Sequence, residues 1–385
     1  MKNLKLSKFS IFIISILVVI FNITLIFYPA EVIKASKDGL SLWFNNVLPS
    51  LLPFMVGINI LISLGSINVI TKLLEPIMKP IFRVSGAGAF SLVAGICCGY
   101  PMGAKIVSNL RENGEISKTE AQRLIGFTNN SGIIFILGTI GIGIFNSKTA
   151  GLFLISVHYL SALITGLVLR NYKHDEKFSY IPREKPRNIQ RLSFSSIFST
   201  NVINSMETLV QIGGFIILFS VLVKVFELID ISSFVVHVLN PISKHFKINE
   251  NTVNSLIYGS LEITNGIRKA STQGLSKQSL IAAACILSFG GFSIHAQSIN
   301  FISKTDIKIG FYIISKLIHA TIALVLGLVI YSLFNFNDAT TIFYSYEENM
   351  RQTFYHSFKM FSISMLFMLI TVFFILRLKR IRFKR

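Results

Sequence analysis

The sequence predicts an all-α protein that crosses a membrane many times and is built from two inverted repeats. Three observations predict this class: an apolar composition, runs of about 20 apolar residues, and a glycine-rich pattern that occurs twice. Of the 385 residues, 52% are hydrophobic and 14% are charged, whereas roughly a quarter of a soluble domain is charged. The composition therefore excludes an ordinary soluble domain.

About eight segments are predicted to be transmembrane helices, because each has close to the ~20 residues that cross a bilayer. Two of them, 120–145 and 279–302, are interrupted by polar residues and glycine. The uninterrupted segments are 9–28, 47–64, 149–170, 203–226, 309–333 and 357–377.

The basic charge of the chain is interpreted as a topology signal. Lys and Arg outnumber Asp and Glu by 37 to 18, which gives a net charge of +19. A cytoplasmic N-terminus places most of these cations in cytoplasmic segments, chiefly 65–123, 170–201 and 377–385, as the positive-inside rule requires. We therefore expect a multi-pass protein of the cell membrane with both termini cytoplasmic, and no nucleic-acid partner.

A polar linker, residues 171–200, is expected to divide the membrane core into two repeats. The first apolar run is too long for a secretory signal and no small-residue cleavage site follows it, so it is expected to be an anchor. The expected organisation is an N-terminal anchor (1–30), a first repeat (40–170), a cytoplasmic linker (171–200), a second repeat (201–335), an external loop (336–356), and a C-terminal transmembrane helix with a basic tail (357–385).

The two repeats share one order of parts: a crossing, an amphipathic piece, a glycine-rich segment, a broken crossing and an intact crossing. Gly95–Lys105 corresponds to Gly259–Lys269, and Ser131–Gly132 corresponds to Gly290–Gly291. If each glycine-rich segment enters and leaves the membrane on one side, each repeat contains three crossings. An odd number inverts the second repeat relative to the first, as in many transporters.

The first glycine-rich segment is predicted to be a re-entrant hairpin that turns near Gly99–Pro101. Pro101 removes a backbone donor and glycine lowers helix stability, so a straight helix is disfavoured. Irregular backbone at membrane depth is tolerated where it is packed in protein or lines a wet cavity. Free amides at the turn would suit an anion or a polar ring substituent; a simple helix kink is the alternative.

The second glycine-rich segment places a carboxylate, Glu262, beside a predicted hairpin tip at Thr264–Arg268. Ionisable residues inside a bilayer are costly and usually mark a pathway. Glu262 could accept hydrogen bonds from a solute, bind a coupling proton or cation, or form a structural pair with Arg268 or Lys269. These readings stay open at this stage.

The broken crossings are expected to supply the other walls of a solute site. Thr128–Gly132 puts four consecutive polar side chains before a glycine, which favours an unwound helix with donors and acceptors for a ligand. Ser288–Gln297 likewise places polar side chains beside glycine, and it adds His295. This histidine is either a solute or proton ligand or an interior histidine whose hydrogen bonds are satisfied. Other polar residues of the crossings are expected to brace helix packing: Glu207, Gln211, Lys316, His319 and His158.

No enzymatic activity is predicted, because the phosphate-loop, Gly-x-Ser-x-Gly and His-Glu-x-x-His motifs do not occur in the sequence. No cofactor or metal site is predicted, the three cysteines are expected to be small buried apolar residues, and the coupling ion, proton or sodium, is left open. The candidate solute-binding residues are Gly99, Tyr100, Pro101, Gly103, Asn129, Asn130, Ser131, Gly132, Glu262, Thr264, Asn265, Gly266, Ser293 and His295.

Four motifs resemble those of the YlbJ-type sporulation integral membrane proteins of endospore-forming bacteria, over about residues 40–335. The motifs are Leu48–Phe54, Gly99–Ala104, Asn130–Gly132 and Glu262–Gly266. The resemblance implies nucleoside-recognition (Gate) domains, similar to the core of concentrative nucleoside transporters, with two hairpins that meet two broken helices.

The same resemblance implies transport of dipicolinic acid across the outer forespore membrane during sporulation. Lys105, Arg268 and Lys269 would suit this dianion, whereas Glu262 would repel it unless protonated or paired. A nucleoside or other neutral polar solute is therefore the alternative, and a membrane scaffold or channel component of spore formation is a second class. The expected partners are a small-molecule solute and membrane lipid; a homo-oligomer or other sporulation membrane proteins are left open.

Overall fold

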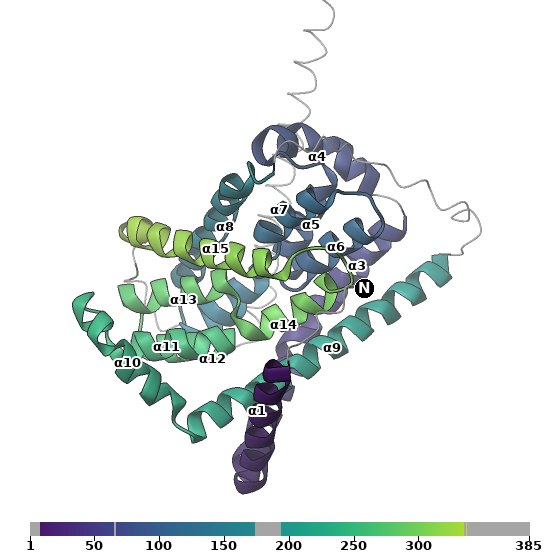
Figure 1. Cartoon of the computed structure of the whole chain (residues 1–385). Helices are drawn as coiled ribbons and strands as arrows, with labels where there is room; N and C mark the ends of the chain where they lie inside the picture. The colour runs from purple at the N-terminus through teal and green to yellow at the C-terminus, as the bar shows by residue number, and fades with distance from the viewer. Residues whose placement is uncertain (1–7, 65–66, 174–193, 335, 337–385) are drawn as a thin grey trace, which may run out of the picture. The chain divides into compact units, whose positions relative to one another are not determined.

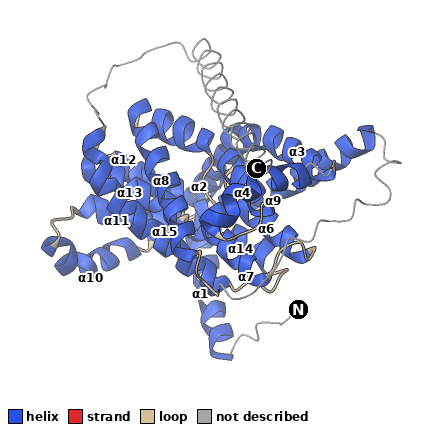
Figure 2. Cartoon of the chain, turned by 90° about the horizontal axis from the view of Figure 1, so that it is seen from above, coloured by secondary structure: helices blue, strands red, loops and turns tan. Residues whose placement is uncertain are grey.

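The chain is all-helical wherever the computed structural model describes it, in residues 8–64, 67–173, 194–334 and 336. Figure 2 shows helices joined by loops, and these residues contain no strand. The predicted all-α class is therefore confirmed. The α-helices are α1 (Lys8–Phe27), α2 (Pro29–Leu42), α3 (Leu48–Ser63), α4 (Ile67–Phe82), α5 (Ala87–Cys98), α6 (Met102–Glu112), α7 (Lys118–Thr128), α8 (Lys148–Leu169), α9 (Phe194–Leu228), α10 (Ile231–His245), α11 (Glu250–Leu261), α12 (Ile263–Ser271), α13 (Lys277–Phe289), α14 (Gly291–Ile302) and α15 (Ile309–Ile330). Shorter irregular helices are the π-helices η1 (Trp43–Val47) and η2 (Phe135–Ile144) and the 3-10 helix η4 (Tyr331–Leu333).

Within the described ranges, five helical spans are long and apolar enough to cross a membrane. They are Lys8–Phe27, Lys148–Leu169, Ser195–Leu228, Lys277–Ile302 and Ile309–Leu333. One further candidate is a pair, Thr71–Phe82 and Ala87–Cys98, bent by 92°. The chain therefore has the helices of an integral membrane protein.

Three predicted crossings do not appear as such spans. The 47–64 segment forms η1 and α3, whose apolar part Leu51–Ser63 is shorter, and the 120–145 segment is divided between α7 and η2. The 357–377 crossing lies outside the described residues, as do nearly all of the 336–356 loop and most of the linker. The total of eight crossings and the cytoplasmic position of both termini stay predictions.

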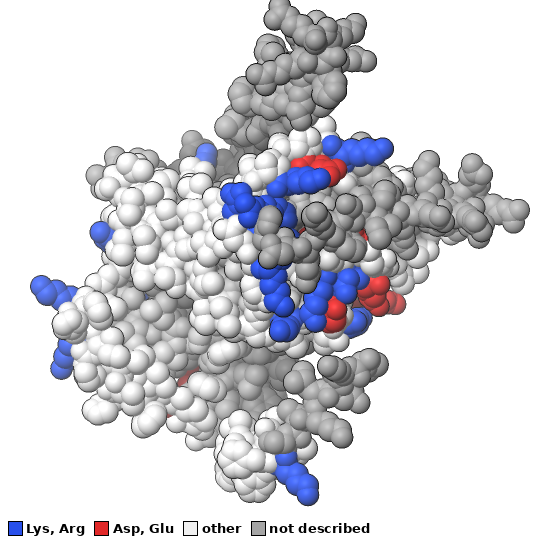
Figure 3. Space-filling view, turned by 45° about the horizontal axis from the view of Figure 1, so that its top comes forward, with Lys and Arg blue, Asp and Glu red and all other residues white. Residues whose placement is uncertain are grey.

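The spans differ in how deeply they are packed. In Lys277–Ile302, 72% of the apolar window is buried, against 6% in Lys8–Phe27. Large apolar side chains of α1 are correspondingly exposed, with Phe9 at 71% and Phe27 at 74%. Figure 3 shows broad uncharged areas on the viewed face; many of its charged side chains gather in one part, and others lie at the left and lower edges of the view. Such apolar surface suits contact with lipid, because lipid replaces water around it.

The order of hairpin, broken helix and intact helix occurs twice. In the first half, α5 packs on α6, which packs on α7, and the broken helix α7–η2 is followed by α8. In the second half, α11 packs on α12, which packs on α13, and the broken helix α13–α14 is followed by α15. Figure 1 draws each hairpin beside its broken helix. The two halves meet where α15 contacts α7 and α8 and where α13 contacts α8.

The first hairpin turns at the predicted place. Helix α5 ends at Cys98 and is followed by Gly99, whose φ of +76° favours glycine, and α6 begins after a cis Tyr100–Pro101 peptide bond. A side chain at Gly99 would also place its Cβ 2.7 Å from the backbone nitrogen of Gly132. The turn therefore needs glycine both for its backbone conformation and for contact with the first break.

The second hairpin turns earlier than predicted. Its turn lies at Glu262, the extended residue between α11 and α12, so Thr264–Arg268 belongs to helix α12 and the predicted tip is wrong. Gly266, which suggested a turn, instead lies at a close contact between α12 and α11. A Cβ at Gly266 would overlap the backbone of Gly259 in α11. Close helix contact therefore accounts for a residue that looks like a turn signal in sequence.

Both broken helices are interrupted where the sequence predicts. Residues 129–132 between α7 and η2 are not helical, and in the second repeat Gly290 and Gly291 have φ of +94° and +65°. Each break packs on the hairpin of its own repeat. A Cβ at Gly103 would overlap the Thr128 carbonyl, and one at Gly291 would lie 3.0 Å from the Gly259 carbonyl. These contacts position the side chains of the two breaks.

Candidate functional site

Asn129 joins three elements at the first break. Its Oδ1 accepts a hydrogen bond from the backbone nitrogen of Ala104 in α6, at 3.3 Å. Its Nδ2 lies 2.9 Å from Ser298 Oγ and 3.1 Å from the Tyr312 hydroxyl. Since Ser298 is in α14 and Tyr312 in α15, this buried amide connects the first hairpin to the second repeat.

Asn130 and Ser131 each bury a polar atom that has no hydrogen-bond partner among the described residues. Asn130 donates to the Phe127 carbonyl at 2.7 Å, but its Oδ1 is unpartnered. The backbone of Ser131 donates to His158 Nε2 at 3.1 Å and accepts from the Tyr159 hydroxyl at 2.7 Å, whereas its Oγ is unpartnered. Such atoms are costly when buried, so they mark a place where a ligand or water would bind.

The second break also buries polar atoms that have no hydrogen-bond partner among the described residues. His295 is 2% exposed, and its Nδ1 lies 3.2 Å from the Tyr312 hydroxyl. Its Nε2 has no partner in the described part of the chain. Ser293 Oγ accepts from Gln297 Nε2 at 3.4 Å, while Gln297 Oε1 is unpartnered. Asn129 and His295 thus meet at one hydroxyl, that of Tyr312.

The first hairpin tip contributes the side chain of a tyrosine. The Tyr100 hydroxyl donates to the Leu287 carbonyl in α13 at 2.5 Å. The amides of Gly99 and Met102 already donate to carbonyls of the same hairpin, those of Gly95 and Gly99. The free amides expected for an anion are therefore absent at these two positions, and the tip connects to the second repeat through Tyr100.

Glu262 caps its own helix. Its carboxylate accepts from the backbone nitrogens of Thr264 and Asn265, at 3.0 and 2.8 Å, and from Asn265 Nδ2 at 3.0 Å. This is the N-cap arrangement, which satisfies free amides at a helix start. Neither Arg268 nor Lys269 forms an ion pair with it within the described residues; Lys269 pairs instead with Glu227 at 3.2 Å.

The predicted site residues therefore fall into two groups. In the first group, Asn129 and His295 are connected through the Tyr312 hydroxyl. The first hairpin tip, Gly99 to Gly103, contacts the backbone of the first break and reaches the second repeat through Leu287. Glu262, Thr264 and Asn265 form a local network of their own, and Gly266 packs on Gly259.

The basic residues expected to suit an anion lie elsewhere. Lys105 donates to Thr208 Oγ1 in α9 at 2.8 Å, and Arg268 is exposed. Lys269 lies over the Tyr258 ring at 4.1 Å in addition to its pair with Glu227. None of the three hydrogen-bonds to a break residue in the described structure.

Lys316, His319 and His158, which the sequence indicated only as residues that brace helix packing, are fully buried, and so is Tyr312, which no sequence pattern singled out. Lys316 donates to the Asn129 carbonyl at 2.7 Å, and His158 binds the backbone of Ser131. The only sequence signal was the spacing of Lys316 and His319 on one face of an apolar helix. The histidines and Lys316 therefore hold the first break as well as bracing helices.

No group of three or more His, Cys, Asp or Glu is placed to hold a metal ion in the described parts of the chain. The cysteines Cys97, Cys98 and Cys285 are free.

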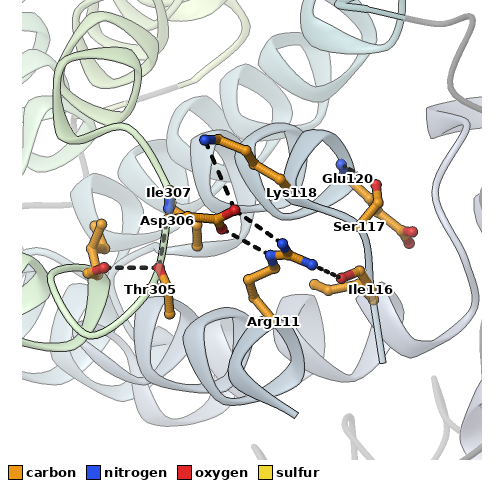
Figure 4. A network of polar contacts seen from close by, with 9 residues as sticks. Arg111, Ile116, Ser117, Lys118, Glu120, Thr305, Asp306 and Ile307 are labelled. Atoms are coloured by element: carbon orange, nitrogen blue, oxygen red, sulfur yellow. Dashed lines mark hydrogen bonds and ion pairs between the residues drawn. The ribbon is translucent and has the colours of Figure 1, made fainter. Parts of the chain in front are cut away.

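An ion pair joins the halves away from the breaks, as Figure 4 shows. Arg111 at the end of α6 binds Asp306 through two hydrogen bonds of 2.8 and 3.0 Å, and Lys118 lies 3.9 Å from the same carboxylate. Asp306 lies between α14 and α15, outside the membrane-spanning helices. The hydrogen bond from Arg111 holds the pKa of Asp306 below its usual range.

The chain is similar to known proteins in sequence and in structure. Residues 44–169 and 209–308 match the Gate family, described as nucleoside recognition. The sporulation integral membrane protein YlbJ of Bacillus subtilis (strain 168) is 34% identical over 349 residues, which cover 85% of this chain and 84% of that protein. A solved structure of a CNTnw double variant in an outward-facing state has a TM-score of 0.49 at 13% identity, with 83% of each chain covered. The match to more than half of the sequence and the extent of the identity to YlbJ show that this chain belongs to the Gate family and is a relative of the sporulation integral membrane protein YlbJ.

Proposed function

We propose that this chain is a membrane transporter of sporulation that moves a small polar or anionic solute, with dipicolinic acid across the outer forespore membrane as the first candidate. The observation that carries the proposal is the set of buried, unpartnered polar atoms at the two breaks: Asn130 Oδ1, Ser131 Oγ and His295 Nε2. The relation to YlbJ supports the sporulation setting.

The physical argument is the cost of such atoms. A hydroxyl or amide buried without a partner costs about 1–3 kcal/mol, and in a membrane protein no bulk water is near to relieve it. Here Ser131 and His295 belong to different repeats and are connected through Asn129 and Tyr312. A polar solute bound between the repeats would satisfy both.

The contacts between the two repeats suit a site that opens when one repeat moves relative to the other. Each hairpin contacts the break of its own repeat through glycine, and the repeats meet through the side chains of Asn129, Tyr312 and Tyr100. Movement of one repeat relative to the other would expose the site alternately to each side, as in transporters built from repeats. A proton or sodium gradient is the expected energy source, and the choice between them is open.

The test is uptake of radiolabelled dipicolinate by vesicles that contain this protein alone. Ser131→Ala removes a buried hydroxyl at the first break, so we expect solute affinity about 3- to 10-fold weaker without loss of folding. Ser156→Ala is the matched control, because within the described residues Ser156 Oγ bonds only the Leu152 carbonyl of its own helix. Uptake of uridine but not dipicolinate would support a nucleoside transporter. Uptake of neither would support a scaffold and contradict the proposal.

A further inference from the structure

Lys316 is a fully buried lysine in α15. Its Nζ donates to the Asn129 carbonyl at 2.7 Å and lies 3.2 Å from His319 Nδ1. The nitrogen also lies 6.0 Å from the centre of the Tyr100 ring. Lys316 therefore touches the first break directly and lies close to the first hairpin tip.

The hydrogen bonds fix the protons of the neighbouring histidines. His319 Nε2 faces the His158 carbonyl at 3.0 Å, which only accepts, so Nε2 carries a proton; with Lys316 as an ammonium, Nδ1 accepts from it at 3.2 Å. His158 Nε2 accepts from the backbone of Ser131, so its Nδ1 carries the proton toward Ser288 Oγ at 3.2 Å. Each imidazole has one donor and one acceptor nitrogen and is neutral. Any positive charge of this cluster therefore belongs to Lys316.

No carboxylate lies within ion-pair distance of Lys316 among the described residues. The groups that face its ammonium are the Asn129 carbonyl, His319 and the Tyr100 ring, all neutral. Two of its three N–H groups have acceptors there, and the third has none. A buried ammonium without a counter-charge is unfavourable, and intramembrane charges usually serve a pathway. An anion is the ligand that would complete this site.

The unpartnered groups of the two breaks are connected to the same lysine. Asn129 supplies the carbonyl that Lys316 binds and the amide that reaches Tyr312, whose hydroxyl faces His295. Ser131 is held by His158, which His319 contacts in turn. Ser131 Oγ and His295 Nε2 are therefore available for further hydrogen bonds to a solute that pairs with Lys316.

We infer that Lys316 is the residue that selects an anionic solute. Its ammonium pairs with a carboxylate of the solute, while Ser131 and His295 hydrogen-bond the remaining polar atoms. The inference rests on the proposed function and narrows its substrate class to small molecules that carry a carboxylate. It also removes the need for a charged contact from Glu262, whose carboxylate has three donors already.

The experiment compares dipicolinate with pyridine-2,6-dicarboxamide, a neutral molecule of nearly the same shape, by calorimetric titration of the full chain in nanodiscs. Wild-type protein should prefer dipicolinate. Lys316→Gln should weaken dipicolinate binding by about 10- to 100-fold, the range for a lost charged hydrogen bond. Binding of the diamide should change by less than about threefold, because this neutral ligand has no carboxylate to pair with Lys316.

Lys105→Gln is the matched control, since Lys105 is a partly buried lysine bonded to Thr208 and should leave both affinities unchanged. Equal weakening of both ligands, or no weakening, in Lys316→Gln would overturn the inference while leaving the proposed function intact. Wild-type protein that binds neither ligand would overturn both. If Lys316→Gln does not fold, Lys316→Met repeats the comparison, and equal wild-type affinity for the two ligands would itself refute the assignment.

Discussion

The Asn129 carbonyl accepts a 2.7 Å hydrogen bond from the ammonium of Lys316, which lies 187 residues further along the chain. The carbonyl is free to accept because the helix is unwound at this point and no residue of the next turn donates to it. The bond therefore connects the break of the first repeat with the last helix of the second repeat.

The close approach of α11 and α12 predicts a strong effect of a single methyl group. Gly266→Ala should destabilise the protein by about 1–3 kcal/mol, since its Cβ would overlap the backbone of Gly259 and force the helices apart. Gly214→Ala in α9 is the control, because nothing lies within 4 Å of its Cβ. Alanine there should be neutral or stabilising by up to about 1 kcal/mol. Thermal unfolding of both variants in one detergent measures the difference, and equal melting temperatures would contradict this packing.

The capping role of Glu262 predicts a loss of stability rather than of selectivity. Glu262→Ala should cost about 0.5–2 kcal/mol, as for other lost N-caps, and Glu262→Gln should cost less because its amide oxygen still accepts. Dipicolinate affinity, measured well below the melting temperature, should stay within about threefold of wild type. Exposed Glu207 in α9 provides a control substitution to alanine. Wild-type stability with lost affinity would instead place Glu262 in contact with the solute.

The Arg111–Asp306 pair predicts a pH-dependent contribution to stability. Because the folded state lowers the pKa of Asp306, the pair stabilises at pH values above the ordinary carboxyl pKa of about 4 and ceases to do so as pH falls through the lowered pKa. Asp306→Asn should cost less than about 1 kcal/mol near neutral pH, since the side chain is 45% exposed.

The measurement is the melting temperature of wild type and Asp306→Asn from neutral pH to about pH 3, the range that covers the ordinary carboxyl pKa. The difference between them should shrink toward acid pH. Glu75→Gln, which breaks an exposed pair with Lys79, should show no difference at neutral pH. A difference that grows in acid would refute the assignment to Asp306.

The inverted-repeat arrangement predicts that the 171–200 linker is cytoplasmic and the 336–356 loop external. Single cysteines at 180 and 340 are introduced after replacement of Cys97, Cys98 and Cys285. An impermeant thiol reagent should label position 340 in intact cells, and position 180 only after the membrane is opened. Labelling of the linker from outside would exclude an odd number of crossings in each repeat.

The sequence alone determined the elements whose causes are local. Apolar runs gave α1, α8, α9 and α15, because about 20 apolar residues satisfy their own backbone only as a helix in lipid. The breaks at 129–132 and Gly290 and the turn at Gly99 were predictable for the same reason, since proline, glycine and consecutive polar side chains disfavour helix within a few residues.

The tertiary structure decided what depends on distant contacts. The sequence predicted a turn at Gly266, whereas the neighbouring helix shows that it is a packing residue. For Glu262 the sequence left open a solute contact, a proton or cation site and a structural ion pair, whereas the geometry of its turn shows a helix cap. Lys316 looked like a bracing residue within α15, and only folding brings it to the Asn129 carbonyl. The spacing of residues along one helix specifies which side chains share a face, but what that face meets is set by packing between helices that are far apart in sequence.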